Sequence, residues 1–529
     1  MLALTLSASV LGGCGGGKAA STSETQAAAA ATTQAAAAAE AATEAPTEAP
    51  APEYLDTLTI GISAYPTNLD PSITVGNNYS TIENQIFDRL LYNTPDGVTS
   101  YICESWEQID DLTHEFKLKS GITFHDGSPL TAEDVKFSFD RHLLDADAVY
   151  STNVTTLLDT IESAEAVDDL TFRLHLKYND PTIYPRLGAG LSLFIIPSDY
   201  FEAVGKDQFA IAPIGTGPYK LTSYTPEEME LTYYDGYYGE KPLAETIIYK
   251  KVTEESAKLA GLVNGELDIA LTTAITTNQA AKAYDNLQVV SVPHSTSHMI
   301  RFDTADTDKY LRQAMSLSMN RQLVIDTIFA GEGSIPNGYN YPVFGDMYIE
   351  DYPYYEYNVE KAKELLDQSS YNGEELIWQV RAGYYDGYEE AAEAFVDMWK
   401  DIGINVKIET LDKIKYNEDT CMTPWSNGLR FDDPIGGLTV LWGKDTTTQN
   451  KLWKDVSPRY NELDAQLAVE TDLEKRREAY REMLEIWDDE VPGIIMYCPN
   501  QRWIVREGLE WTNTPGYSIS FRAEYLKLK

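Results

Sequence analysis

Residues 15–53 set the first limit on the fold, because their composition cannot form a hydrophobic core. After a run of glycines they consist mainly of Ala, Thr, Glu and Pro, and the first aromatic residue of the chain is Tyr54. A segment without apolar periodicity gains too little from burial to offset the entropy that it loses on ordering. We therefore expect 15–53 to be a disordered tether spanning about 35 Å, and the fold to be confined to residues 54–529.

The segment before the tether, 1–14, is an apolar run that is too short to cross a membrane as a helix. It ends in "LGGC", which resembles a bacterial lipobox, a signal that is cleaved so that its cysteine becomes a lipidated N-terminus. We expect 1–14 to be a signal segment and Cys14 to be the lipidation site. Acyl chains on Cys14 would anchor the protein at the extracytoplasmic face of the cell membrane.

The charge balance excludes one large class of partners. The chain has 83 Asp and Glu against 41 Lys and Arg, a formal net charge of −42. Such a charge repels phosphate backbones, so we expect no nucleic-acid partner and interpret the acidity as a solubility feature. Beyond Cys14 the cysteines are Cys103, Cys421 and Cys498, which form no CxxC pair and therefore predict neither a zinc site nor a dithiol centre. Buried free thiols are the expectation, with one disulfide as the alternative.

Strand and helix patterns alternate along residues 54–529. "TLTIGI" (57–62) and "LTHEFKLK" (112–119) alternate as strands, and "STIENQIFDRLL" (80–91) has a helical pattern with Ser80 placed to cap it. Later helices lengthen, and the strand "INVKIETL" directly follows one of them. This interleaving predicts an α/β fold of mixed layers.

The stretch "TFHDGSPLTAEDVKFSFDR" (123–141) places a histidine and an aspartate side by side, as a catalytic loop would. Asp126-Gly127 is nevertheless a turn pair, and Thr131 followed by Asp134 is a capping box that should start a helix. Turn, cap and helix explain nearly every residue. We therefore interpret His125 as a turn or packing residue, and the stretch as architecture.

The longer stretch "EFKLKSGITFHDGSPLTAEDVKFSFDR" (115–141) closely resembles the signature of the extracytoplasmic solute-binding proteins of peptide/nickel-type ATP-binding-cassette (ABC) importers. Further motifs of that family occur in the family's order along the chain, including "NLDPS" (68–72), "PIGTGPYKL" (213–221) and "WKDIGINVKI" (399–408). The resemblance implies a periplasmic-binding-protein-like fold of two α/β lobes joined by a hinge. It places the first lobe at 54–92, 205–290 and 498–529, an inserted subdomain at 93–204, and the second lobe at 291–497.

The resemblance also implies a function. The chain would be a monomeric carrier that captures a small solute between its lobes, delivers it to ABC permease subunits in the membrane, and performs no catalysis. No cofactor or metal is expected, and a short peptide or peptide-like solute is the first choice of ligand. A carboxylated non-peptide solute, a glycoside or a metal chelate is the alternative, while a surface sensor or a hydrolase ranks lower.

Peptide-binding relatives hold extended ligands through backbone hydrogen bonds, and the resemblance places the binding strips on two short segments. The first-lobe strip is Val75, Gly76 and Asn77; the second-lobe strip is Pro424, Trp425, Ser426 and Asn427. Trp425 either stacks on the ligand or packs in the core, and both readings stay open.

One position departs from the peptide-binding pattern. Relatives commonly carry an aspartate three residues after this tryptophan, paired with the ligand's ammonium group, but here the position is Gly428. Asp432 or Asp433 could supply the missing charge, whereas Arg430 would suit a carboxylate on the ligand. The alternative for all three is an internal network that shapes the loop.

Two further pairs of side chains are candidate site residues, one pair of tyrosines and one pair of histidines. Tyr384 and Tyr385, in "GYYDGY", could line a pocket for a mixed polar and apolar ligand. His294 and His298 lie in "PHSTSHM" with no acid or cysteine between them, which is a weak pattern for a metal site. The chain has no GxSxG, HExxH or phosphate-binding loop, so the sequence does not predict an enzyme.

Overall fold

The computed structural model describes residues 54–73, 77–144, 152–190, 193–271, 273–294, 296–353, 356–415, 420–512 and 519–529. The predicted signal segment, Cys14, the tether, Val75 and Gly76 lie outside these residues. In the described part, no helix has both the length and the apolar character needed to span a bilayer.

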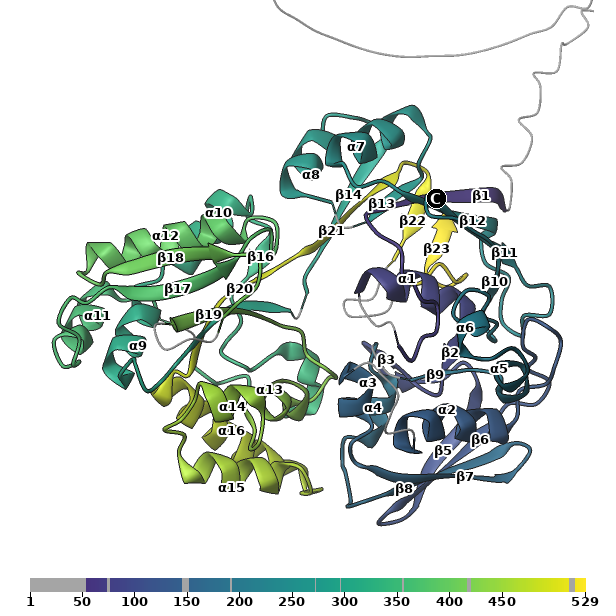
Figure 1. Cartoon of the computed structure of the whole chain (residues 1–529), viewed down its shortest axis with the longest axis horizontal. Helices are drawn as coiled ribbons and strands as arrows, with labels where there is room; N and C mark the ends of the chain where they lie inside the picture. Colours follow the sequence, from purple (N-terminus) through teal and green to yellow (C-terminus); the bar gives the residue numbers. More distant parts are fainter. Residues whose placement is uncertain are drawn as a thin grey trace, which may run out of the picture. The chain divides into compact units, whose positions relative to one another are not determined.

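The first large sheet has seven strands in the order β10-β11-β12-β1-β13-β21-β14 (Figure 1). Its strands are β1 (Leu55–Ile62), β10 (Tyr219–Tyr224), β11 (Glu228–Tyr233), β12 (Ala244–Lys251), β13 (Ile269–Leu271), β14 (Leu287–Val292) and β21 (Gln501–Arg506). The centre is parallel, β1 running with β12 and β13, while β21 is antiparallel to both of its neighbours.

Both faces of this sheet are buried, as alternating side chains show. Ile269 and Trp503 belong to one apolar cluster, whereas Ala270 and Ile504 belong to another on the opposite face. Helices α7 (Glu255–Asn264) and α8 (Ile275–Ala281) supply the second cluster, and α1 (Asn77–Ile86) packs into the first. Burial on two faces accounts for the short apolar runs of β13 and of the middle of β21.

A separate antiparallel sheet, in the order β5-β6-β8-β7, lies within residues 103–176. It comprises β5 (Cys103–Asp110), β6 (Thr113–Leu118), β7 (Ile161–Asp168) and β8 (Thr171–Leu176), and α2 (Ala132–Leu144) packs on it. Shorter elements surround it: β2 (Asp88–Arg89), β3 (Tyr92–Thr94), β4 (Gly97–Thr99), α3 (Thr152–Leu157), α4 (Ile183–Gly188), β9 (Phe194–Ile195), α5 (Ser198–Val204) and α6 (Lys206–Phe209).

The second large sheet has six strands in the order β16-β20-β15-β19-β17-β18. They are β15 (Ser297–Phe302), β16 (Gly333–Ser334), β17 (Leu376–Arg381), β18 (Val406–Leu411), β19 (Thr420–Asn427) and β20 (Gly493–Pro499). Met299 and its partner Ile495 face one helical layer, while Ile300 and Ile494 face the other. This arrangement is a three-layer α/β/α sandwich.

One layer contains α9 (Lys309–Leu317), α10 (Arg321–Ile328) and α12 (Tyr388–Asp401), and α11 (Val359–Leu366) lies beside α9. The other contains a 3-10 helix (Pro342–Met347), a π-helix (Ile435–Thr439), α13 (Val440–Trp442), α15 (Pro458–Leu467) and α16 (Leu473–Glu490), with α14 (Thr447–Lys451) next to α13. A small pair, β22 (Leu509–Trp511) and β23 (Leu526–Leu528), ends the chain.

The chain passes between the two large sheets twice. β14 ends at Val292 and β15 begins at Ser297 in the other sheet, while β20 ends at Pro499 and β21 begins at Gln501. Figure 1 shows β20 running on into β21. Two α/β bodies joined by crossing strands confirm the predicted fold class; the domain boundaries themselves stay a prediction.

Two expectations about helices were wrong in detail. The helix predicted at 80–91 spans Asn77–Ile86, so Ser80 lies inside it and does not cap it. Asp88 and Arg89 instead form a strand with Phe194 and Ile195, because Asp88 is held by Arg522 (2.7 Å) from the C-terminal segment. Tertiary contacts of this kind override a local helical pattern.

The stretch 123–141 is architectural, as predicted. Helix α2 begins directly after Thr131, whose backbone N–H donates to the Asp134 carboxylate at 2.9 Å. His125 accepts the Gly215 N–H at Nδ1 (3.2 Å), which leaves Nε2 to donate to the Gly217 carbonyl (2.9 Å). Burial lowers the pKa of His125 to about 4, so the imidazole is neutral and ties this loop to "PIGTGPYKL".

Replacement of Gly217 by alanine should destabilise the fold. A Cβ atom there would lie 2.5 Å from the Gln85 carbonyl oxygen and 2.7 Å from the Ile86 carbonyl carbon. These are backbone atoms of α1, so the helix must shift, and we expect Gly217→Ala to lower the free energy of unfolding by about 2–3 kcal/mol in urea denaturation. Ser223→Ala, at an exposed position of β10, is the control; equal stability of the two variants would contradict the close approach.

Candidate functional site

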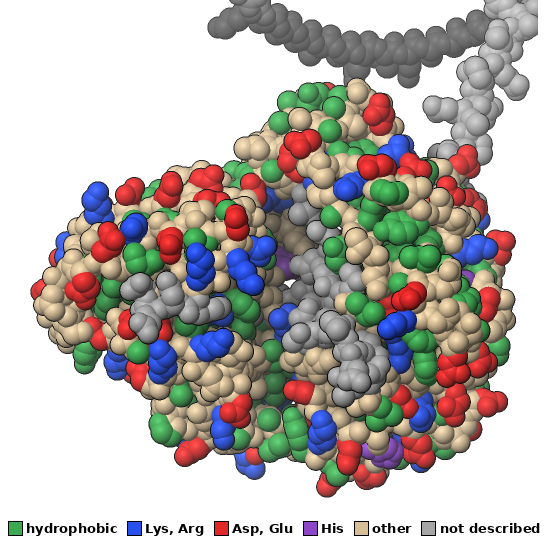
Figure 2. Space-filling model, in the orientation of Figure 1, with side chains coloured by type: hydrophobic (Ala, Val, Ile, Leu, Met, Phe, Trp, Pro, Cys, Tyr) green, Lys and Arg blue, Asp and Glu red, His purple; other side chains and the backbone are tan. Residues whose placement is uncertain are grey.

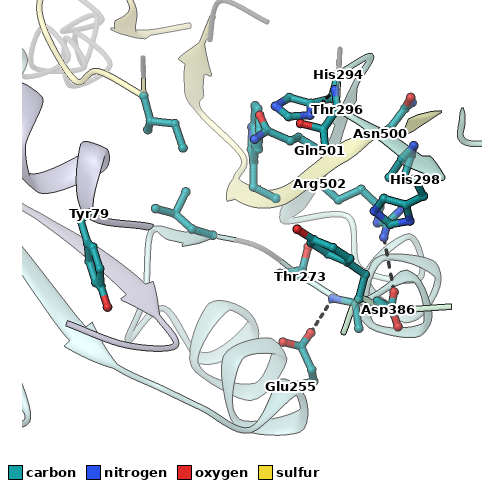
Figure 3. A pocket seen from close by; sticks show the side chains of 16 residues that line it. Tyr79, Glu255, Thr273, His294, Thr296, His298, Asp386, Asn500, Gln501 and Arg502 are labelled. Atoms are coloured by element: carbon teal, nitrogen blue, oxygen red, sulfur yellow. Dashed lines mark hydrogen bonds and ion pairs between the residues drawn. The ribbon is translucent and has the colours of Figure 1, made fainter. Parts of the chain in front are cut away.

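A cavity of about 540 Å³ lies where the chain crosses between the two large sheets. Both crossings border it: His294, Thr296 and His298 lie along the first, and residues 499–503 form the second (Figure 3). Tyr385 and Asp386 contribute from the loop between β17 and α12, and residues from the seven-stranded body complete the lining: Tyr79, Glu255, Leu271, Thr273, Ala274 and Ile519. The volume suits a small solute.

Three of the predicted site residues come together beside this cavity. Tyr384 donates to the Ser426 hydroxyl at 3.1 Å, and the Tyr385 hydroxyl lies 2.8 Å from the same oxygen. Ser426 is opposite His298 in the β15–β19 pairing, and the Tyr385 ring lies 4.4 Å from the imidazole of His298. This network fixes the tyrosine loop against β19, and Tyr385 itself lines the cavity.

Trp425 is half-buried and precedes Ser426 on β19. The guanidinium carbon of Arg301 lies 4.1 Å from the centre of its ring, a cation–π contact, so one face is already covered. The indole Nε1 has no hydrogen-bond acceptor within the described residues. β19 pairs with β17 only at Thr420 and Met422; beyond Met422, Tyr384 and Tyr385 from the loop after β17 contact Ser426.

The two aspartates of the loop after β19 differ in their burial and in their partners. Asp433 is buried and accepts from Arg476 Nη2 at 3.0 and 2.9 Å, so its charge is used inside the protein. Asp432 is half-buried, and no residue of the described ranges donates to its carboxylate; burial raises its pKa to about 6. The Arg430 N–H donates to the Gly436 carbonyl (3.0 Å), which helps to shape the loop.

Other predicted residues are only partly placed. Asn77 begins α1, and Asn427 ends β19, but the structure describes the backbone alone at both positions. Tyr384, Trp425, Ser426, Arg430, Asp432 and Asp433 do not themselves line the cavity.

Three charged residues of the cavity were not predicted from the sequence: Arg502, Asp386 and Glu255. Asp386 Oδ2 accepts the N–H of Ile275 at 2.9 Å and contacts Arg502 Nη2 at 3.3 Å. The only signal was an arginine inside the apolar strand "RWIV" and an aspartate in the tyrosine-rich loop. Neither signal points to the other, because 116 residues separate them.

The two histidines of the cavity are neutral. Burial lowers the pKa of His294 to about 4 and that of His298 to about 3. The described residues contain no group of three or more His, Cys, Asp or Glu side chains arranged to hold a metal ion. Cys103, Cys421 and Cys498 form no disulfide with one another; Cys103 and Cys498 are buried and Cys421 is half-buried.

Acidic side chains are scattered over the visible face of the protein without forming one block (Figure 2). Figure 2 shows red carboxylates spread over the visible face and interspersed with blue cations. This distribution fits the interpretation that the net charge of −42 is solvated.

Comparison with known proteins gives a consistent result. Residues 97–449, more than half of the chain, match the family model described as "Bacterial extracellular solute-binding proteins, family 5 Middle". The oligopeptide-binding protein AppA of Bacillus subtilis is 23% identical over 88% of this chain and 91% of its own length. Di/tripeptide-binding protein 1 of Pseudomonas aeruginosa is 27% identical over 81% of this chain and 86% of its own.

A solved structure confirms the fold. The periplasmic binding protein DppA of Helicobacter pylori, in complex with the peptide STSA, superposes with a TM-score of 0.75 at 22% identity. The match covers 90% of this chain and 98% of that one.

The neutral state of His298 predicts a pH dependence. The pKa of His298 is about 3 in the folded protein and about 6.5 in the unfolded chain. As the pH falls, the unfolded chain therefore takes up this proton at a higher pH than the folded protein does. Stability is therefore lost as the pH falls below about 6.5. In His298→Gln this loss is absent, so the slope of unfolding free energy against pH, from 6.5 to 4.5, should be shallower by up to about 1.4 kcal/mol per pH unit.

The measurement is urea denaturation at a series of pH values. His175→Gln, which removes an imidazole of β8 outside the cavity, is the matched control for histidine replacement. An identical slope in His298→Gln and the parent protein would show that His298 is not held neutral.

Proposed function

Because the chain belongs to family 5 of the bacterial extracellular solute-binding proteins, we propose that it captures a short peptide or peptide-like solute in the cavity at the crossing strands. The observation that carries this proposal is the cavity of about 540 Å³, which both large sheets and both crossings line. A site built from two bodies can close on a ligand by a change at the crossing segments.

Several features favour a peptide among small solutes. The relatives include an oligopeptide-binding and a di/tripeptide-binding protein by name. Beyond Met422, β19 has no strand paired on its β17 side, although Tyr384 and Tyr385 contact Ser426 there. The buried Trp425 indole N–H has no acceptor in the described residues. An extended peptide can add to such an edge as a further strand. We propose Trp425, Ser426 and Asn427 as one binding strip, and Val75, Gly76 and Asn77 as the other.

We assign the loop residues different roles. No described residue donates to the Asp432 carboxylate. Asp432 is therefore the candidate partner for a ligand ammonium group, a role that relatives give to the aspartate at the position of Gly428. Asp433 shapes the loop through Arg476, and Arg430 belongs to the same loop. Tyr384 and Tyr385, whose hydroxyl groups contact Ser426, form the wall of the site beside β19.

The solute would be passed unchanged to the permease subunits of an ABC importer, since family members are solute-binding proteins rather than enzymes. We further propose a monomer that is tethered by 15–53 and anchored through lipid on Cys14. The lobes would follow the predicted boundaries, with 93–204 as the inserted subdomain. A carboxylated non-peptide solute in the same cavity is the second candidate, favoured by the missing aspartate at Gly428.

Binding without turnover tests the proposal. Di- to pentapeptides, each free and N-acetylated, should raise the unfolding temperature of the purified protein and be recovered intact by mass spectrometry. A ligand at about 100 times its Kd stabilises the fold by about 2.7 kcal/mol. No stabilisation by any peptide, or the appearance of cleaved products, would contradict the proposal.

The role of Asp432 is tested in the same assay. Its carboxyl ionises near pH 6, so affinity for free-amine peptides should rise between pH 5 and 7, while N-acetylated peptides should show no such rise. Asp432→Asn should remove the rise without changing the binding of acetylated peptides. A rise that persists in Asp432→Asn would assign the ammonium contact elsewhere.

The lipid anchor is tested by fractionation. In a bacterial host that processes lipoproteins, the full chain should sediment with membranes, and Cys14→Ser should release it into the soluble extracytoplasmic fraction. A parent protein that is already soluble would contradict lipidation at Cys14.

A further inference from the structure

Arg502 is a buried cation whose donors are only partly used. It is the second residue of β21, and its side chain is 7% exposed. Nη2 contacts Asp386 Oδ2 at 3.3 Å, whereas Nε and Nη1 are buried with no hydrogen-bond partner in the part of the chain that the structure describes. Figure 3 shows the side chain running along the cavity toward Asp386.

Such a group is costly to bury. Burial lowers the pKa of Arg502, while Asp386 and Glu332 favour its charged form, and a guanidinium stays protonated in proteins. An ionised donor that loses water without gaining an acceptor is destabilised. The single contact to Asp386 offsets little of the free-energy cost of burying Arg502, because the Asp386 carboxylate is 46% exposed. The cavity therefore lacks an acceptor at this position.

The backbone holds Arg502 rigidly. β21 lies between β13 and β14, Arg502 is in register with Ser291, and its carbonyl accepts the Thr273 N–H at 3.2 Å. Its donors are thus presented at a fixed place next to the crossing, and a rigidly placed donor loses little entropy on binding.

The carboxylates of the cavity do not prevent an anion from binding there. Glu255 accepts from Lys258 Nζ and from the Ala274 N–H, both at 2.7 Å. Asp386 accepts the Ile275 N–H at 2.9 Å in addition to its contact with Arg502. The neighbouring residue Gln501 lacks a donor rather than an acceptor, since its buried Oε1 accepts no hydrogen bond in the described ranges. A ligand with an anionic acceptor and a nearby N–H satisfies both residues.

We propose that Arg502 binds a carboxylate of the solute, so that the ligand is an acid anchored at the β20–β21 crossing. The inference rests on the proposed function for the place of binding and narrows the class of ligand. In a peptide this group is the C-terminal or a side-chain carboxylate; in the second candidate it is the acid of the non-peptide solute. Charge-assisted hydrogen bonds of this type are stronger than neutral ones.

The test compares acids with their amides. Trialanine, Ala-Leu-Ala and Ala-Tyr-Ala are titrated as free acids and as C-terminal amides, together with the non-peptide pairs benzoate and benzamide, and glutarate and glutaramide. For every acid that binds, amidation should weaken the parent protein's affinity about tenfold or more. Arg502→Gln should bind acids and amides alike.

Arg506→Gln is the matched control. Arg506 is on the same strand but pairs with Asp268 at 2.9 Å and does not line the cavity, so this variant should discriminate as the parent does. If Arg502→Gln fails to fold, the acid and amide series on the parent protein decides alone. Equal affinity for peptide acids and amides would overturn the Arg502 proposal and leave peptide binding intact.

The two proposals fail separately. Binding of benzoate or glutarate, but of neither their amides nor any peptide, would support Arg502 and overturn the peptide ligand. A panel in which nothing binds would overturn both.

Discussion

The structure depends on two consecutive strands, β20 and β21, that belong to different large sheets. β20 is an inner strand of the six-stranded sheet and β21 an inner strand of the seven-stranded sheet, and only Asn500 separates them. Two rigid sheets therefore meet at a single peptide segment, beside the second crossing between β14 and β15. Side chains at these crossings cannot be covered by either sheet's own helices, and so they line the cavity. The position of the site is a consequence of the topology.

Much of the fold could be predicted because its signals are local. The capping contact between Thr131 and Asp134 and the burial of α2 follow from residues within a few positions of one another. The motifs that carried the family resemblance also contact each other: Asp70 pairs with Arg141 at 2.6 Å, and His125 bonds to Gly217. These contacts hold residues 123–141 to segments that adjoin the seven-stranded sheet. They identify the family through its architecture and do not report on the ligand.

The site was harder to predict because its determinants are distant in sequence. Whether Asp433 faces a ligand or a protein cation depends on Arg476, 43 residues away, and the partner of Arg502 is 116 residues away. The end of the first helix was predicted wrongly for the same reason, since Asp88, just beyond that end, is held by Arg522, which is 434 residues away in the chain. By contrast, the tyrosine loop directly joins β17 to α12, so its place in the fold follows from its neighbours in the chain.

The central claim is that a small solute occupies the cavity at the crossing and leaves unchanged. A crystal structure of the protein saturated with a tripeptide that stabilises it tests this claim most directly. We expect an intact peptide in the cavity, with its carboxylate at Arg502 and its chain extending past Tyr385 toward β19. A peptide bound elsewhere, or only its cleavage products in the cavity, would contradict the account.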